Sequence, residues 1–554
     1  RMVQSQSLIV PHPAIQDFDE IPMGMNQRFI GTTMNEMDSA EEETVALSED
    51  LDEQPLKSLE EIIGLGRYAV LAFFSMNLVI LSTVSVIVFM VYAGASAQVT
   101  GCGTEVFPKD QIEACRRLSE MRDSGDNCTV QTQSQFQSVS IEFGYLCSDA
   151  LTVKSSTTAQ MVAILLGAFV FGQVSDLYGR KFTMIIALSG IAVFSFLVSL
   201  SRSFLEFVIT RLAVGFFAGG TSGVHGVYIV EHCQKHHRML ISNIVTWSPN
   251  FALAPIIAYF AEDWRTLSLY STVINIVAIA FLAVCSESPR FLIQKRKYEK
   301  AREALAYIGM INGTGDETDK DVARMLAAEK EKLAMGTKQK RKYHYFDLFK
   351  DAALRKYTLI IGFGLAITSL QSYGLMFNQE SLSGSMYVNG VFFGAFRWVV
   401  NLIVGVLDIK WSGCTRKRVA FVMKTTNFIC LALIATIFAL GLDQEYSTVI
   451  RIASIIVLVG VGPVFCTKFL TASEIYPTGV RNIGTSFQSM SSRLGTIFGT
   501  TVFLLNVVHY SLPYAILASL LFIDIFLFQR IIPETKGVDL KDHFPVKDEE
   551  DDQA

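Results

Sequence analysis

The stretches GQVSDLYGRK, residues 172–181, and DIKWSGCTRKR, residues 408–418, decide the fold, because each follows a long apolar segment and ends in a similar charged turn. A second repeat follows each of them. EHCQKHHR begins at Glu231, and EIYPTGVR begins at Glu474, about 240 residues further along the chain. Two repeated halves around one central site are the architecture of secondary transporters. The sequence therefore predicts two related bundles of helices.

We interpret these repeated charges as a cytoplasmic gate. Each carboxylate falls at a helix end, where a basic loop from a neighbouring helix can pair with it. Such pairs would hold the two halves together in one state and release them in the other. Exposed pairs contribute only about 0–1 kcal/mol each, so several are needed. The predicted gate residues are Asp176, Gly179, Arg180, Lys181, Glu231, Arg238, Asp408, Glu474 and Arg481.

The composition places the chain in a membrane. Of its 554 residues, 51% are hydrophobic and 18% are charged, whereas a soluble chain carries about 25% charged residues. The apolar residues come in runs of roughly 20, which is the length of a membrane-spanning helix. We expect an all-α membrane protein with twelve transmembrane helices in two six-helix bundles. Their predicted spans are 68–95, a helix from 156, 182–202, 206–230, 239–260, 267–285, 357–378, 384–407, 419–440, 447–469, 480–508 and 511–531.

Lysine and arginine accumulate on one side of these spans, which makes that side cytoplasmic by the positive-inside rule and places both termini there. The predicted organisation is a disordered acidic tail (1–58), an N-terminal bundle (59–285), a cytoplasmic linker (286–356), a C-terminal bundle (357–532) and an acidic tail (533–554). The lipid bilayer is the expected surrounding. A net charge of −5 argues against a nucleic-acid partner.

The long loop at 96–155 is predicted to be extracellular. It holds Cys102, Cys115, Cys128 and Cys147, an even number that suggests two disulfides in an oxidising compartment. Three pairings are possible, and the spacing does not choose among them. Asn127 begins an N-glycosylation acceptor in the same loop. These features predict a multi-pass glycoprotein of the plasma membrane.

Several motifs together give the chain a family resemblance. It resembles the organic cation/organic anion/carnitine transporters of the major facilitator superfamily, from SLEEIIGLGRY at residue 58 to PETKG at residue 533. The resemblance implies the major facilitator fold. Unlike sugar carriers, which have a Gln-Gln pair in the seventh helix, this chain has only Gln371 there. The second gate is degenerate in sequence. The remaining motifs of the resemblance are EFGYLC (142–147), DWR (263–265), ESPRFL (287–292), YGLMFN (373–378) and EIYPTGVRNIG (474–484).

Two arginines fall deep inside predicted spans. Arg493 lies thirteen residues into its helix, which is about 20 Å at 1.5 Å per residue, and Arg397 is similarly deep. A charge at this depth usually faces a cavity, and fixed positive charge attracts anions. The resemblance agrees, because the anion and carnitine branches also carry an arginine at the Arg493 position. Tyr373, Gln371 and Trp247 are the predicted companions of the two arginines.

Other ionisable residues in the spans receive different interpretations. Lys424 and Lys468 are expected to snorkel to the cytoplasmic surface, and Asp524 is the one deep acid, in a helix expected to be peripheral. No deep carboxylate occurs in the first helix. This absence favours facilitated diffusion or exchange against a cytosolic anion over proton symport.

The expected function is secondary transport of small organic ions, with anions or zwitterions preferred, by alternating access. One alternative is a carrier of organic cations or sugars. Another is a non-transporting sensor or partner-binding protein on the same scaffold. The sequence contains no nucleophilic triad, metal-ligand spacing or phosphate-binding loop, so no enzyme activity, cofactor or metal is expected.

Overall fold

The fold is described from a computed structural model. It describes residues 59–108, 111–124, 128–233, 241, 244–335, 346–379, 382–411, 413–476 and 480–536. Asn127, Arg238, and the predicted tails up to residue 58 and beyond residue 536 lie outside these ranges, and so does the side chain of Arg481.

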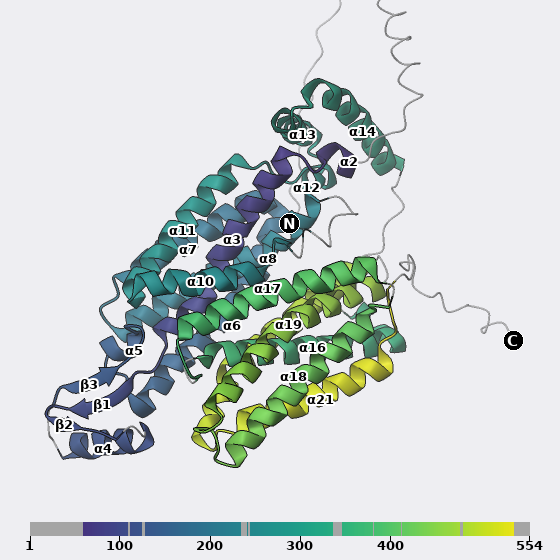
Figure 1. The fold of residues 1–554 in the computed structure, drawn as a ribbon. Helices are drawn as coiled ribbons and strands as arrows, with labels where there is room; N and C mark the ends of the chain where they lie inside the picture. Colours follow the sequence, from purple (N-terminus) through teal and green to yellow (C-terminus); the bar gives the residue numbers. More distant parts are fainter. Residues whose placement is uncertain are drawn as a thin grey trace, which may run out of the picture. The chain divides into compact units, whose positions relative to one another are not determined.

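The first half of the described chain is a bundle of six long helices (Figure 1). α6 packs along α8, α8 along α7, and α7 along α11, while α3 lies against α8, α10 and α11. α6 begins six residues before its predicted start, because the segment ALTVKS, residues 150–155, is helical as well. The helices are α3 (Arg67–Ala93), α6 (Ala150–Tyr178), α7 (Arg180–Ser199), α8 (Phe204–Glu231), α10 (Trp247–Ala261) and α11 (Trp264–Val284).

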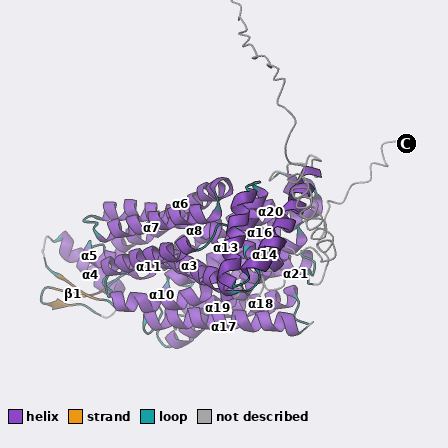
Figure 2. Ribbon diagram, turned by 90° about the horizontal axis from the view of Figure 1, so that it is seen from above, coloured by secondary structure: helices purple, strands orange, loops and turns teal. Residues whose placement is uncertain are grey.

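The second half repeats this arrangement. α16 packs along α20, and α18 lies against both α19 and α21. The two halves meet where α10 lies against α17 and α6 against α20 (Figure 2). The helices are α16 (Ala352–Phe377), α17 (Met386–Lys410), α18 (Arg416–Ala439), α19 (Ser447–Ile475), α20 (Arg481–Val502) and α21 (Leu512–Ile531).

Ten of these twelve helices are long and apolar enough to span a membrane. The two others have identifiable reasons for falling short. In α20, a serine- and threonine-rich face and Arg493 lower the hydropathy. In α10 the structure describes only 15 helical residues, because Thr246 is extended, with φ −137° and ψ 174°, and the helix begins at Trp247. The all-α architecture of two six-helix bundles is confirmed.

The cysteine-containing loop folds into a small unit of its own. Strands β1 (Gln98–Cys102), β2 (Glu105–Val106) and β3 (Val130–Gln133) form an antiparallel sheet in the order β2-β1-β3, beside α4 (Gln111–Asp123). The disulfides pair Cys102 with Cys128 and Cys115 with Cys147. A short helix, α5 (Val139–Glu142), leads from this unit towards α6. We call the end of the bundles that carries this unit the loop face.

Four further helices cover the opposite end, which we call the linker face. α2 (Leu59–Ile63) packs with α13 (Tyr298–Asn312) and α14 (Gly315–Met335), next to α12 (Pro289–Gln294). Asn312 fastens this group, since its Oδ1 accepts from the Tyr68 backbone N–H at 3.0 Å and its amide donates to the Ile63 carbonyl. A further turn, α15 (Asp347–Lys350), precedes α16.

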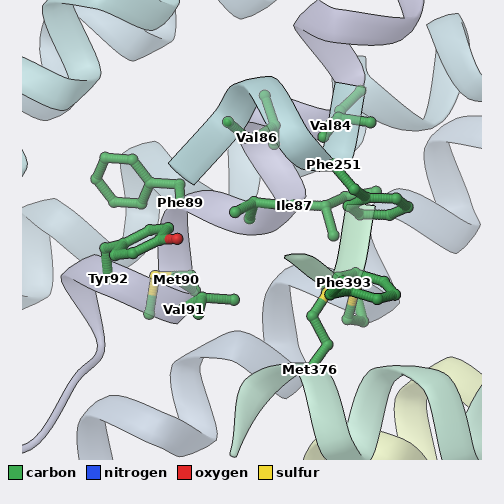
Figure 3. Packing of buried hydrophobic residues seen from close by; sticks show 14 of the residues in the cluster. Val84, Val86, Ile87, Phe89, Met90, Val91, Tyr92, Phe251, Met376 and Phe393 are labelled. Atoms are coloured by element: carbon green, nitrogen blue, oxygen red, sulfur yellow. The ribbon is translucent and has the colours of Figure 1, made fainter. Parts of the chain in front are cut away.

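The largest hydrophobic core runs through both halves. Figure 3 shows part of it, where the Phe251 ring of α10 and the Phe393 ring of α17 lie near Ile87 and Met376. The two phenyl rings are 5.4 Å apart between centroids. α10 and α17 therefore meet through apolar contacts, and the polar residues described next lie beside them.

Candidate functional site

Arg493 projects from α20 towards the other half of the protein. Its Nη2 donates a 2.9 Å hydrogen bond to the Ser222 hydroxyl of α8. The guanidinium also lies close enough to Tyr373 of α16 and His225 of α8 for electrostatic interaction with both. Arg493 therefore sits at the interface between the two bundles.

Arg397 of α17 lies in the same neighbourhood. Its guanidinium carbon is 5.6 Å from the centre of the Phe251 ring and 5.7 Å from that of Phe393. Its Nε is buried and has no hydrogen-bond partner. Tyr373 interacts electrostatically with Arg397 as well as with Arg493. The two arginines and Tyr373 thus form one cluster, which we call the arginine site.

Aromatic rings border this site. Trp247 of α10 packs edge-on against His225, at 5.8 Å between centroids, and also contacts Phe251. Gln371 lies half a turn before Tyr373 on α16; it is buried, and its side-chain amide nitrogen has no partner. Trp247, Tyr373 and the two arginines are therefore brought together. Gln371 lies on the adjoining turn, without a described contact to either arginine.

In the described part of the chain, the arginine site contains no counter-charge. Within the described ranges, neither Arg493 nor Arg397 forms an ion pair with a carboxylate. A buried cation is costly unless it is paired. The arrangement therefore suits a ligand that brings its own negative charge, with rings to contact an apolar part.

A third membrane-embedded arginine, Arg211 of α8, was not singled out from the sequence. Its Nη2 donates to the Val86 carbonyl at 2.8 Å and to Gln160 Oε1 at 2.7 Å, and its guanidinium lies 4.2 Å above the Phe89 ring. All these partners belong to the first bundle. Arg211 therefore has the contacts of a structural residue, unlike the two arginines at the interface.

The prediction that Lys424 and Lys468 snorkel is wrong. Their side chains are 1% and 0% exposed and turn to Asp524 of α21, whose Oδ2 lies 3.0 and 2.8 Å from the two ammonium nitrogens. We call these three residues the lysine cluster. Long flexible side chains snorkel only when no buried partner is within reach, and here α21 supplies one.

The predicted gate residues of the first half do come together. Arg180 donates to Asp176 at 3.0 Å and to Glu231 at 3.2 Å. Gly179 has a φ of +118°, and any Cβ there would collide with the Glu287 carboxylate. Glu287 in turn accepts from the backbone N–H groups of Arg180 and Lys181. This glycine is therefore required by both the turn and the close approach.

The second half repeats the main contacts of the first, despite its degenerate sequence. Arg416 donates to Asp408 at 2.8 Å and to Glu474 at 3.3 Å. Glu534 accepts from the backbone N–H groups of Arg416 and Lys417, each at 3.0 Å, as Glu287 does in the first half. Glu287 and Glu534 were not predicted as gate residues. The sequence feature that could have identified them is the glutamate in the motifs ESPR and PETKG, which follow the sixth and the twelfth helix.

These ion pairs join helices of the same bundle. Within the described ranges, neither the Arg180 group nor the Arg416 group pairs across the two halves. In this conformation each group instead fastens the linker-face ends of its own helices. Closure of the two halves by these groups stays a prediction about another state.

Contacts between the bundles are found at the loop face. Gln135 accepts from the Met386 backbone N–H at 2.9 Å, and its backbone carbonyl accepts from the Tyr387 hydroxyl at 2.8 Å. The Tyr387 ring stacks on Tyr92 at 5.5 Å, and Thr158 of α6 is bonded to Thr500 of α20. The loop face is therefore closed.

This fold, with two matching bundles and a polar cluster between them, is that of a major facilitator transporter. The chain belongs to the sugar (and other) transporter family, whose model matches residues 79–544. The solved structure of the xylose transporter XylE from E. coli matches 85% of this chain and 99% of its own, with a TM-score of 0.58 and 15% sequence identity. The fold expectation is confirmed.

Curated relatives confirm the resemblance to organic cation and carnitine transporters. The chain is 27% identical over 400 residues to the organic cation transporter protein of Drosophila melanogaster, which covers 71% of each chain. It is 26% identical over 409 residues to the human organic cation/carnitine transporter 2, which covers 72% of this chain and 70% of that protein. The chain is therefore a secondary transporter of the major facilitator type, with a small-molecule substrate.

Proposed function

We propose that the protein transports small organic anions or zwitterions by alternating access. One observation carries this proposal: Arg493 and Arg397 converge with Tyr373 between the bundles, and no carboxylate among the described residues neutralises them. A substrate carboxylate would supply the missing charge. Its apolar part would lie against Trp247 and the phenyl rings of α10 and α17.

The relatives' names support both readings of the substrate. They are named for organic cations and for carnitine, and carnitine is a zwitterion that carries a carboxylate as well as a quaternary ammonium. A zwitterion with a carboxylate would agree both with the names of these relatives and with the two arginines of the site. A simple organic cation would need a negative group, which the described part of the site does not offer.

The contacts that close the loop face support an alternating-access cycle, in which this conformation would be the one open towards the linker face. We infer that this face is cytoplasmic and that the protein resides in the plasma membrane, with both termini in the cytosol, as the positive-inside rule predicts. Substrate would move by facilitated diffusion or in exchange for a cytosolic anion. The predicted gate groups would close the linker face in the opposite state.

The test is uptake of radiolabelled benzoate, carnitine and tetraethylammonium by cells that express the full chain. The variants are Arg493→Ala and, as a matched control, Arg530→Ala, which removes an exposed positive charge from the same bundle. We expect carnitine or benzoate uptake to fall about 10- to 100-fold in Arg493→Ala, as for loss of a charge-assisted bond, and to persist in the control.

Other outcomes would contradict the proposal in different ways. Tetraethylammonium uptake that survives Arg493→Ala would show a cation carrier. Absence of uptake and of exchange for all three compounds, with the protein at the cell surface, would favour a non-transporting sensor. Surface biotinylation supplies the expression control for each variant.

A further inference from the structure

The lysine cluster lies inside the second bundle, away from the predicted gate groups. Lys424 is on α18, Lys468 on α19 and Asp524 on α21, and all three side chains are at most 1% exposed. Lys468 also donates to the Thr368 hydroxyl of α16 at 3.0 Å, and Lys424 lies 4.0 Å above the Phe528 ring. Four helices of one bundle therefore meet at this cluster.

The charges of the cluster do not balance. Two ammonium groups share one carboxylate, and only one of its oxygens takes part, because Asp524 Oδ1 is buried without a hydrogen-bond partner. An unbalanced charge inside a membrane bundle is strongly disfavoured. Lysine can relieve it by releasing a proton, which arginine cannot do. The cluster thus has two forms, one neutral and one with a single excess positive charge.

Among the residues that the structure describes, no other charged group contacts the cluster. The charges that act on Lys468 are Asp524 and Lys424, and those that act on Lys424 are Asp524 and Lys468. Arg397 of α17 and Arg493 of α20 belong to the arginine site. The remaining charged residues on the four packed helices lie near helix ends: Arg355, Lys356, Arg416, Lys417, Arg418, Arg451, Glu474 and Arg530.

Two helices connect the cluster to the arginine site. On α16, Thr368 comes five residues before Tyr373. On α19, two residues lie close to Arg397. Gly462, six residues before Lys468, packs against the Arg397 side chain. Cys466, two residues before Lys468, interacts with Arg397 electrostatically. Six helical residues correspond to about 9 Å. A charge bound at one site is therefore felt at the other.

We propose that Lys424, Lys468 and Asp524 form a binding site for one proton, whose occupancy is linked to the occupancy of the arginine site. The linkage rests on the proposed function, since it assumes that the arginine site takes a negative charge. A bound carboxylate favours the protonated cluster, and by reciprocity the protonated cluster favours the carboxylate. The proton leaves one lysine for water and returns to the same amine.

This site changes the expectation about coupling. The sequence argued against proton symport because the first helix lacks a deep carboxylate. The structure places a titratable group elsewhere, in the second bundle, and its ligand is a proton that a lysine holds. Anion uptake should therefore strengthen as the pH on the linker face falls.

The first measurement needs no substrate. Full-length protein is reconstituted in vesicles on a solid-supported membrane, and a rapid pH jump is applied. We expect a transient current from proton binding in the wild type, and its loss in Lys468→Met and Lys424→Met. Each of these variants leaves a neutral lysine–aspartate pair, so both should fold. Lys350→Met, which removes an exposed lysine of α15, is the matched control and should keep the current.

The second measurement tests the linkage through carnitine counterflow in the same vesicles at pH 6 and pH 8. We expect the apparent affinity to rise about tenfold or less per unit fall in pH in the wild type, and to be pH-independent in both lysine variants. A transient that survives in both variants overturns the proton site. Counterflow without any transient also overturns it, whereas a transient without counterflow of carnitine or benzoate overturns only the proposed function.

Discussion

The arginine site and the lysine cluster both bury two cations, yet they treat the charge differently. The lysine cluster lies inside one bundle and brings its own acid, with Asp524 2.8 Å from Lys468. The arginine site lies between the bundles and has no described acid, only the Ser222 hydroxyl and aromatic faces. A charge compensated within one bundle can keep its contacts while the bundles move. A charge left uncompensated between bundles is available to a ligand.

Arg211 shows what a purely structural buried arginine looks like in this protein. Its partners are a backbone carbonyl, a glutamine side chain and a phenyl ring, all within the first bundle. Burial alone therefore does not identify a binding arginine. A binding arginine is better identified by two features together: it lies at the bundle interface, and its guanidinium has few hydrogen-bond acceptors nearby.

The largest effect should come from removing the acid of the lysine cluster. Asp524→Asn leaves two buried ammonium groups without a counter-charge, and breaking a buried pair in this way costs about 3–5 kcal/mol. We expect a large fall in thermal stability of the purified protein in detergent. Arg493→Ala should change stability by less than about 1 kcal/mol, because it removes a single hydrogen bond.

The contrast between the arginine site and the lysine cluster would fail if Asp524→Asn had little effect on stability and Arg493→Ala a large one. A stable Asp524→Asn protein would mean that the lysines are already neutral or solvated. A strongly destabilised Arg493→Ala protein would make that arginine a structural residue like Arg211. Asp524→Glu serves as the control, since it retains the charge and should lose less stability than Asp524→Asn.

Much of this architecture could be predicted from sequence, and the reasons are physical. Apolar runs fix the helices because the bilayer leaves the backbone no other way to satisfy its polar groups. The repeated turns at Asp176 and Asp408 predict the two halves and place charged residues at helix ends, where Arg180 pairs with Glu231 in the structure. The depth of Arg493 in its span was enough to place it in the membrane interior and, in the structure, at the bundle interface.

The errors arose where helix rotation and long-range packing decide the outcome. Lys424, Lys468 and Asp524 are on three helices, and hydropathy does not tell which faces meet, so the lysines were expected to snorkel. In this conformation the gate pairs join helices of one bundle, and spacing along the chain cannot distinguish such a contact from one across bundles. Closure of the two halves by these groups in another state stays a prediction. The roles of Glu287 and Glu534 required the backbone geometry of the following turns.

A smaller effect should distinguish the two groups at the linker face. Arg180 and Glu231 are 8% and 10% exposed, and Asp176, the other partner of Arg180, is 74% exposed. Glu474 is 22% exposed, and its arginine, Arg416, also keeps Asp408, which is only 14% exposed, at 2.8 Å. We expect Glu231→Gln to cost about 1–3 kcal/mol of stability and Glu474→Gln clearly less. Thermal unfolding of both variants, measured side by side, checks this order. Equal losses would show that burial does not separate the two groups.

The smallest effect should be a pH dependence at Glu534. Burial raises the pKa of its carboxyl, but the backbone N–H groups of Lys417, Lys536 and Arg416 and the Thr415 side chain lower it, and the net pKa lies below the usual value. A carboxyl with a depressed pKa stabilises the fold above its unfolded pKa and loses that contribution as pH falls through the folded value.

We therefore expect the wild type to lose more thermal stability than Glu534→Gln below about pH 4.5, with a difference of about 1–3 °C. The partly exposed position keeps this effect small. Glu534→Gln should also be less stable than the wild type at neutral pH, because an amide accepts more weakly from the three backbone N–H groups. If the thermal stabilities of the two proteins changed in parallel with pH, the Glu534 carboxylate would not be held by these N–H groups. The start of α18 would then be anchored only by the ion pairs of Arg416.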